Sequence, residues 1–375
     1  MKRYLALASF LLTVSFASAQ LQKISIPAGT PEDKVLQAAS NEPDAQKKLA
    51  MYQDVAQQFA SNPDAVAFAN WQISQQYQNA GDLDKALEFG DKALAATPRN
   101  LDILVSQASI AQQKKNNAKV MEYAFHGGEV YASIGKQTKP EGMSDQDFAS
   151  HVEEERTGAK SSYEFLEAAA FNVIASENDA KKRMSDIERF TPAFPNSRFD
   201  EQVASYAMVS LSELKDNQRL VAYGEKTLQT NPNSLPTLLL LAGTLADDPK
   251  PGNLNKAASY AQKAIEVAKA DAPDADRSRK LSAGVAHSTL GYALMKQDKT
   301  QSAIGELKSG AALLKGQDDQ QYAIALYRLG YAYAKLNKVT EAREVLMECT
   351  KIPGPVQQMS QDLLTKVNAA RAKAK

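Results

Sequence analysis

The 375-residue sequence predicts an all-α protein, a right-handed α-solenoid of stacked helix-turn-helix repeats. Three observations predict this fold. The chain has only 18 glycines and 15 prolines, too few for a protein dominated by loops and short strands. Its hydrophobic fraction of 43% and charged fraction of 23% are those of a folded globular chain. Segments far apart in the chain repeat one pattern of apolar, glycine and alanine positions.

Charge balance and rare residue types exclude several kinds of function. Lys+Arg and Asp+Glu both total 44, so nucleic acid is not an expected partner. The one cysteine, Cys349, excludes an intrachain disulfide and a zinc finger built on cysteines, and the three histidines are scattered. We therefore expect no metal ion and no cofactor. Cys349 is expected to be buried in a helix core, with a reactive or dimer-forming thiol as the alternative.

The segment 1–19 has the layout of a secretory signal peptide. Lys2 and Arg3 form a basic start, the segment 4–16 is mainly apolar, and Ala17 and Ala19 give the small-residue pattern of a cleavage site. The apolar run is shorter than the roughly 20 residues that a membrane-spanning helix needs. No cysteine lies near the cut, so no lipid anchor is expected. We expect cleavage after Ala19, export to the periplasm or out of the cell, and a mature chain that does not span a membrane.

Two long-range alignments define the repeating units. The first aligns 290–307 with 329–346, and the second aligns 89–101 with 223–235. In the second alignment, charge sign, apolar character and one proline agree. The clearest pairs of the first alignment are Leu290 with Leu329, Gly291 with Gly330, Ala303 with Ala342, and Leu307 with Leu346.

These positions resemble the tetratricopeptide repeat (TPR), a unit of about 34 residues with the pattern W-x2-L-G-x2-Y and then A-x3-F-x2-A-x4-P. The clearest copy is 323–356, with the motif positions Leu329, Gly330, Tyr333, Ala342, Leu346 and Cys349. Further copies are placed at 67–100, 101–134, 161–194, 201–234, 235–271 and 284–317. The resemblance implies helical hairpins that stack into one continuous core and form a concave groove.

The copies and the segments between them give the expected domain organisation. The signal peptide is 1–19, and 20–66 is an N-terminal extension, extended and mobile to about position 30, with a capping helix pair. An inserted loop and helix occupy 135–160, and a C-terminal capping helix occupies 357–375. TPR-like repeats 1–2 occupy 67–134, repeats 3–5 occupy 161–271, and repeats 6–7 occupy 272–356.

Residues that recur within the units have physical reasons. Glycine or alanine at the eighth position lets two helices approach closely, and a final proline stops the second helix because it lacks a backbone N–H. Gly81-Asp82 and the segment 298–300 supply turn and N-cap chemistry between helices. Ser144, with Asp147 shortly after it, resembles a capping box and predicts a helix that continues toward the next unit.

The resemblance also implies which residues line the groove, namely positions 2, 5, 9, 12 and 13 of each first helix. Carried onto this sequence, they include the candidate partner-binding residues Phe68, Trp71, Gln75, Tyr292, Lys296, Tyr327, Tyr331 and Lys335. We expect the three tyrosines to cluster, with packing inside the core as the alternative for each aromatic ring. Members that bind chaperone tails clamp a terminal carboxylate with Lys and Asn in the groove. Positions 5 and 9 lack these residues here, so that function is not expected.

The predicted function is therefore that of a non-enzymatic, exported scaffold that binds a protein or peptide partner in its groove. A role in envelope assembly or secretion follows only by analogy with the family. A small-ligand or glycan receptor that uses the aromatic groove is the alternative from another class. An enzyme with an unrecognised site is a third hypothesis, because the sequence has none of the common catalytic motifs.

The export pattern predicts a processed N-terminus. When the full-length chain is expressed in a bacterium, the mature protein should begin at Gln20 and should appear in the periplasmic or extracellular fraction. Intact-mass measurement of each fraction checks this. An uncleaved chain in the membrane pellet would show that the segment 1–19 is not a signal peptide.

Overall fold

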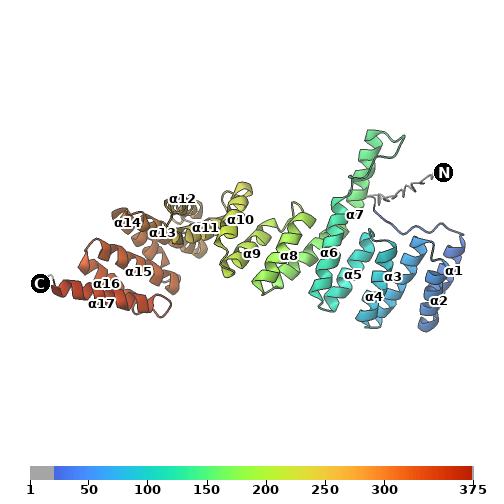
Figure 1. Ribbon diagram of the computed structural model, residues 1–375, viewed down its shortest axis with the longest axis horizontal. Coiled ribbons are helices and arrows are strands. Elements are labelled where there is room, and N and C mark those ends of the chain that lie inside the picture. Colours follow the sequence, from blue (N-terminus) through green and yellow to red (C-terminus); the bar gives the residue numbers. More distant parts are fainter. Residues whose placement is uncertain (1–20, 374–375) are drawn as a thin grey trace, which may run out of the picture. The chain divides into compact units, whose positions relative to one another are not determined.

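The computed structural model describes residues 21–373; the predicted signal peptide lies outside the described residues. The described part contains 17 α-helices and no strand, and most successive helices within each unit pack against one another (Figure 1). The expected all-α solenoid is therefore confirmed. The chain divides into two compact units, unit 1 up to Asp200 and unit 2 from Glu201 onward. None of the described helices is long and apolar enough to cross a membrane.

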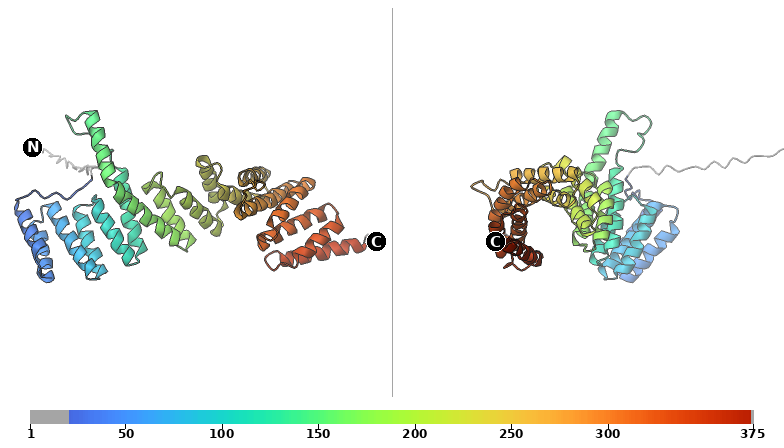
Figure 2. Two further views of the ribbon diagram at one scale, coloured as in Figure 1. Left: turned by 180° about the vertical axis from the view of Figure 1, so that it is seen from behind. Right: turned by 60° about the vertical axis from the view of Figure 1, so that its left-hand side comes forward.

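Unit 1 contains the first eight helices. They are α1 (Pro31–Asn41), α2 (Ala45–Gln58), α3 (Pro63–Asn79), α4 (Leu83–Ala96), α5 (Leu101–Gln113), α6 (Asn117–Ala132), α7 (Asp145–Ser176) and α8 (Ala180–Ala193). The loop and helix expected at 135–160 take the form of a loop followed by the start of α7, which runs without a break into the next unit of the array. The first half of α7 (green) extends beyond its neighbours in both views of Figure 2.

Unit 2 contains the other nine helices. They are α9 (Asp200–Glu213), α10 (Asn217–Thr230), α11 (Leu235–Asp247), α12 (Pro251–Ala268), α13 (Arg277–Lys296), α14 (Thr300–Leu314), α15 (Asp319–Lys335), α16 (Val339–Cys349) and α17 (Gln357–Lys373). Helix α17 packs its Leu363, Leu364 and Val367 against the last helical pair. Each of the seven predicted repeat copies overlaps one pair of successive helices, from α3–α4 to α15–α16, although several copies begin inside the first helix of their pair.

Side-chain caps explain where many helices begin. Asp82 Oδ1 accepts from Lys85 N at 3.1 Å, directly after the turn at Gly81, whose φ of +79° favours glycine. Ser144 Oγ accepts from Asp147 N at 3.0 Å and starts α7 as the sequence predicts. The turn at 298–300 differs, because α14 follows Lys299, which makes no side-chain cap bond.

Close helix–helix contacts at glycine confirm the repeat register. A Cβ on Gly330 would lie 2.6 Å from Leu346 Cδ2, and a Cβ on Gly291 would lie 2.6 Å from Leu307 Cγ. The first long-range alignment thus relates two equivalent contacts. The second does the same, since it relates the contact of Gly90 with Gln107 to that of Gly224 with Leu241. Only a residue without a side chain fits such a contact without displacing its neighbour.

Cys349 has the expected core position. It is fully buried at the end of α16, where its Sγ lies 3.2 Å from Ala323 O and 3.0 Å from Ser360 Oγ on α17. Burial raises the pKa of the thiol above its ordinary value, so the neutral, unreactive form is favoured. The alternative of a reactive thiol is not supported by this environment.

The segment before α1 differs from our expectation of a mobile terminus. The stretch 21–27 is extended, but it docks on unit 1. The chain crosses the ends of α3 and α5, as the left view of Figure 2 shows, and it bonds to Asp64 and Arg99. Ile24 and Ile26 pack into two core clusters of this unit. We call residues 21–26 the N-terminal arm.

The glycine contacts predict unequal effects of one substitution at two helical sites. Gly330→Leu should destabilise the protein by about 1–3 kcal/mol or more, because the new side chain must displace Leu346. Gly305→Leu is the matched control, since a Cβ there meets nothing within 4 Å. Urea denaturation of both variants measures the difference. Equal midpoints for the two variants would mean that the helices do not touch at Gly330.

Candidate functional site

Five of the predicted groove residues line one pocket of about 300 Å3 in unit 2. Helix α13 contributes Tyr292, Met295 and Lys296, helix α15 contributes Tyr327, Arg328, Tyr331 and Lys335, and α17 contributes Met359. Residues three and four positions apart share a face of a helix, so the spacing on α13 and α15 turns each set toward the pocket. The expected clustering of the three tyrosines is therefore present.

The three tyrosines differ in how much of each ring is accessible. Tyr331 is 44% exposed, whereas Tyr292 and Tyr327 are partly buried and pack against the core of the last helical pairs. Burial raises the pKa of Tyr327, with smaller contributions from Tyr331 and Tyr292. Tyr292 and Tyr327 thus pack partly inside the core, which was the alternative to a groove position. Tyr331 is the ring best placed to contact a partner.

Arg328 is the pocket residue that sequence reasoning missed. Its guanidinium lies 4.4 Å from the centroid of the Tyr292 ring, and its Nη1 donates to Ser288 Oγ at 3.1 Å. Among the described residues, no carboxylate forms an ion pair with it, although Asp247 lies near enough to raise its pKa. Burial has the larger effect and lowers the pKa of Arg328. The pocket thus holds a partly buried cation whose guanidinium has further N–H donors for a ligand.

The predicted residues of unit 1 do not belong to this pocket. Phe68 packs into the core of the first helices and meets Tyr52 edge-on, with ring centroids 6.5 Å apart. Trp71 is partly buried, and its Nε1 has no hydrogen-bond partner among the described residues. Gln75 is also partly buried. These three residues and the five of unit 2 therefore belong to separate surfaces.

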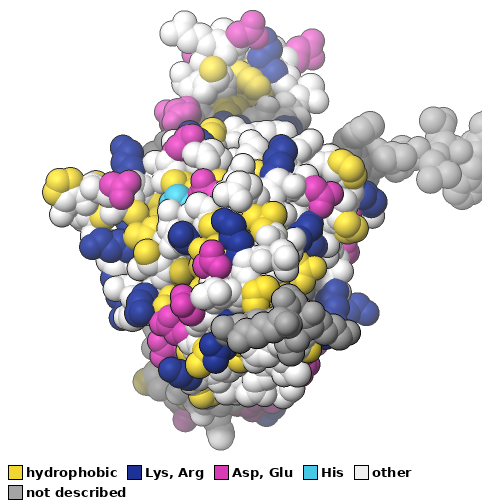
Figure 3. All heavy atoms as spheres, turned by 90° about the vertical axis from the view of Figure 1, so that its left-hand side faces the viewer, with side chains coloured by type: hydrophobic (Ala, Val, Ile, Leu, Met, Phe, Trp, Pro, Cys, Tyr) yellow, Lys and Arg dark blue, Asp and Glu magenta, His cyan; other side chains and the backbone are white. Residues whose placement is uncertain are grey.

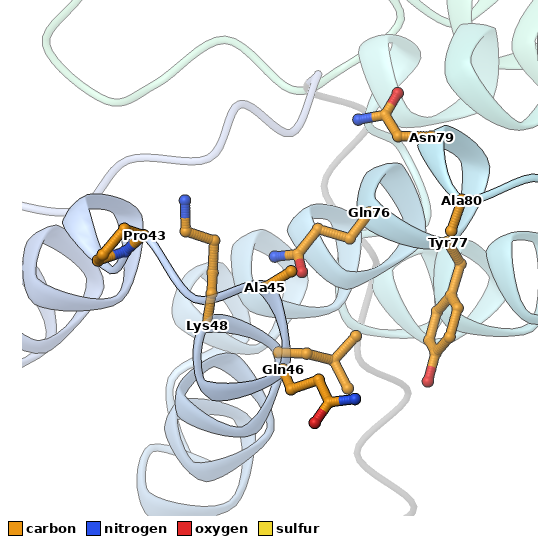
Figure 4. Close-up of a pocket in the computed structure, with 9 residues that line it drawn as sticks. Pro43, Ala45, Gln46, Lys48, Gln76, Tyr77, Asn79 and Ala80 are labelled. Atoms are coloured by element: carbon orange, nitrogen blue, oxygen red, sulfur yellow. The ribbon is translucent and has the colours of Figure 1, made fainter.

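A second pocket of about 860 Å3 lies in unit 1, between the start of α2 and the end of α3 (Figure 4). Lys48 is the one charged side chain among the nine that line it. Tyr77 stacks on Phe89, with a centroid distance of 5.5 Å, so its ring is held by the protein itself. This open hollow brings together no set of described groups that favours a particular ligand.

A family model for the tetratricopeptide repeat matches residues 323–354, which span α15 and α16. Residues 323–354 thus form a tetratricopeptide repeat. A tetratricopeptide repeat protein from Parabacteroides merdae is similar at 13% identity and a TM-score of 0.34, over 80% of this chain and 98% of that one. The TPR2AB domain of yeast Sti1 in a complex with pHSP90 is similar at 14% identity and a TM-score of 0.28, over 81% and 99%. No curated protein matches the sequence.

The TPR register gives the two predicted lysines an internal role. Lys296 and Lys335 both stand at position 13 of a repeat. Lys296 Nζ donates to Ala246 O at 3.0 Å, and Lys335 Nζ donates to Met295 O at 3.4 Å and to Asp298 Oδ1 at 2.7 Å. Each lysine thus caps the end of the preceding first helix, where a cation is favourable. Their charges are largely used within the TPR array.

The described residues of the TPR array contain no cluster of His, Cys, Asp or Glu that could hold a metal ion. His151, the one histidine followed closely by three acidic residues, lies 3.6 Å from Glu155 on the exposed part of α7. Lys/Arg and Asp/Glu side chains are intermixed on the face shown in Figure 3, and no broad basic surface is visible among the described residues there. The pocket of unit 2 offers aromatic, thioether and cationic side chains to a ligand.

The unequal burial of the tyrosines predicts unequal effects on stability. Tyr331→Ala should change the free energy of unfolding by about 0.5 kcal/mol or less, because the ring is exposed. Tyr292→Ala should lower it by about 2–4 kcal/mol, since it removes packing and the contacts with Lys296 and Arg328. Urea denaturation of both variants tests the difference. A strong loss at Tyr331 would place that ring in the core.

Proposed function

We propose that this TPR protein is a non-enzymatic, exported scaffold that binds a protein or peptide partner at the pocket of unit 2. The single observation that carries the proposal is the meeting of three tyrosines with an incompletely bonded arginine in one pocket. Tyrosine and arginine are among the side chains that most often dominate the energy of protein interfaces. Export is supported by the N-terminal pattern of the sequence alone.

The side chains of the pocket indicate which chemical group of a partner would bind there. Arg328 is partly buried and forms no ion pair with a carboxylate among the described residues, and a partly buried cation of this kind is stabilised when an anion reaches it. A guanidinium binds a planar carboxylate through two parallel hydrogen bonds. The tyrosine rings offer apolar area beside it. The partner segment therefore carries an acidic group, from an Asp or Glu side chain or a chain terminus, next to an apolar residue.

Arg328 differs from the terminal-carboxylate clamp that the sequence lacks at positions 5 and 9. It stands directly after Tyr327, at position 6, and its hydrogen bond joins it to Ser288 at position 5 of the preceding repeat. Its neighbours are rings, whereas the lysines beside it are occupied by helix ends. The pocket is thus suited to one carboxylate held against an apolar wall.

A small acidic ligand is the second candidate. The pocket volume of about 300 Å3 lies at the lower end of the range for small-molecule sites. Stacking on Tyr331 beside Arg328 would suit an acidic sugar. This candidate predicts binding of the free compound, such as glucuronic acid, in the absence of any peptide.

Peptide libraries test the proposal directly. Randomised octapeptides with a central Glu, Gln or Lys, each as the free acid and as the C-terminal amide, are titrated against the full chain. The Glu library should bind best, and the two terminal forms show whether a side chain or a terminus supplies the carboxylate. Arg328→Gln should weaken binding of the best library by about tenfold or more, which is about 1.4 kcal/mol.

Arg343→Gln is the control for that substitution, because Arg343 lies exposed on the adjacent helix α16. It removes the same charge from the same repeat and should leave affinity unchanged. Equal binding of the Glu and Gln libraries as C-terminal amides, with no gain from a free C-terminal acid, would refute the carboxylate site. Unchanged affinity in Arg328→Gln would refute it as well. Binding of glucuronic acid with none of the peptides would favour the second candidate.

A further inference from the structure

The N-terminal arm is bound to unit 1 as a separate peptide would be. Gln22 N donates to Arg99 O at 3.4 Å, and Arg99 N donates to Gln22 Oε1 at 2.9 Å. Ser25 N donates to Asp64 Oδ2 at 3.2 Å. The contacts fall at the start of α3 and just before α5, so one extended stretch bridges two successive helical pairs.

Alternate side chains of the arm face unit 1. Gln22, Ile24 and Ile26 are partly buried, whereas Lys23 and Ser25 are exposed. This period of two is that of an extended strand with one bound face. Ile24 packs against the cluster of Ala67, Ala93 and Ile103, and Ile26 packs against a cluster that includes Leu36 and Ile73.

The docked arm leaves part of the surface that it covers without optimal contacts. Trp71 packs against the same three residues as Ile24, and its buried Nε1–H has no hydrogen-bond partner among the described residues. A buried donor without an acceptor is unfavourable, so this donor next to the arm's cluster remains unsatisfied while the arm is docked. Neither isoleucine is fully buried. The arm is therefore held by a few contacts at the edge of the core.

We propose that this surface of unit 1 is a binding site for an extended peptide, and that the arm is its built-in competitor. The expected ligand is a partner segment with aliphatic side chains at alternate positions and small or uncharged residues between them. Its aliphatic side chains bind where Ile24 and Ile26 pack in the free protein, and the peptide displaces the arm. The proposal concerns unit 1 alone and does not depend on the pocket of unit 2.

The short tether makes the competition effective. The linker between Ile26 and the start of α1 at Pro31 is only 27–30, so the arm meets its site at a local concentration of the order of millimolar. A free peptide must compete with the docked arm. Its apparent affinity is its intrinsic affinity multiplied by the fraction of molecules in which the arm is undocked. A protein whose arm cannot dock should therefore bind such a peptide about tenfold or more tightly than the wild type.

The arm's own sequence supplies the probe for the test. A labelled peptide with the sequence of 21–28 is titrated against the full chain and against the full-length double variant Ile24→Ser with Ile26→Ser. The variant should bind the peptide about tenfold or more tightly than the wild type. Trp71 is the only tryptophan of the chain, so its fluorescence reports occupation of the site.

Two controls isolate the docked face of the arm. The double variant Lys23→Ser with Pro27→Ser changes exposed residues and should bind the peptide as weakly as the wild type does. A peptide with serine in place of both isoleucines should bind neither protein. No binding to the variant, or equal binding to variant and wild type, would overturn the proposal. Wild-type dimers held by exchanged arms would also overturn it, in favour of a second copy as the occupant.

Hydrogen exchange on the wild type gives a readout that does not depend on the variant's folding. The amides of Gln22 and Ser25 are bonded to Arg99 and Asp64 and should exchange slowly in the free protein. Saturating unlabelled peptide should remove that protection and leave the rest of unit 1 protected. Protection that persists at saturation would show that the arm is a fixed part of the fold.

Discussion

The close approach of neighbouring helices at glycine is the constraint on which the other features of the structure depend. A solenoid has no central core, so each helical pair is held by the pair before it and the pair after it. Gly291 and Gly330 bring their helices against Leu307 and Leu346. Because both contacts have the same form, α13 and α15 present equivalent faces, and the tyrosines at positions 5 and 9 meet in one pocket.

The stacking of the helices also places two of the predicted groove lysines in hydrogen bonds within the protein. Lys296 and Lys335 look like partner-binding groups in the sequence, yet each reaches the carbonyls that end the preceding first helix. Those carbonyls need donors, and the stacked geometry places a lysine beside them. Arg328 instead bonds the side chain of Ser288, in the middle of α13. The remaining donors of Arg328 are therefore available to a partner.

Local periodicity explains what could be predicted from the sequence. The helix pairs, the contact of Gly330 with Leu346 and the meeting of Tyr292, Tyr327 and Tyr331 all follow from spacing within and between repeats. Arg328 escaped notice because position 6 is not a groove position in the repeat, and its burial depends on neighbouring helices. The docking of the arm was also missed, because Ile24 and Ile26 contact residues far along the chain.

The two proposed sites would select their ligands by different physics. At the arm, backbone hydrogen bonds and alternating aliphatic side chains recognise an extended shape, which many sequences can adopt, so affinity there depends strongly on what competes. In the pocket, the partly buried guanidinium of Arg328 has no ion-paired carboxylate among the described residues, so it favours a ligand that brings an acid. A neutral ligand would bury Arg328 further without compensating its charge, which is unfavourable. The pocket can therefore discriminate between acidic and neutral ligands, whereas the apolar surface under the arm cannot.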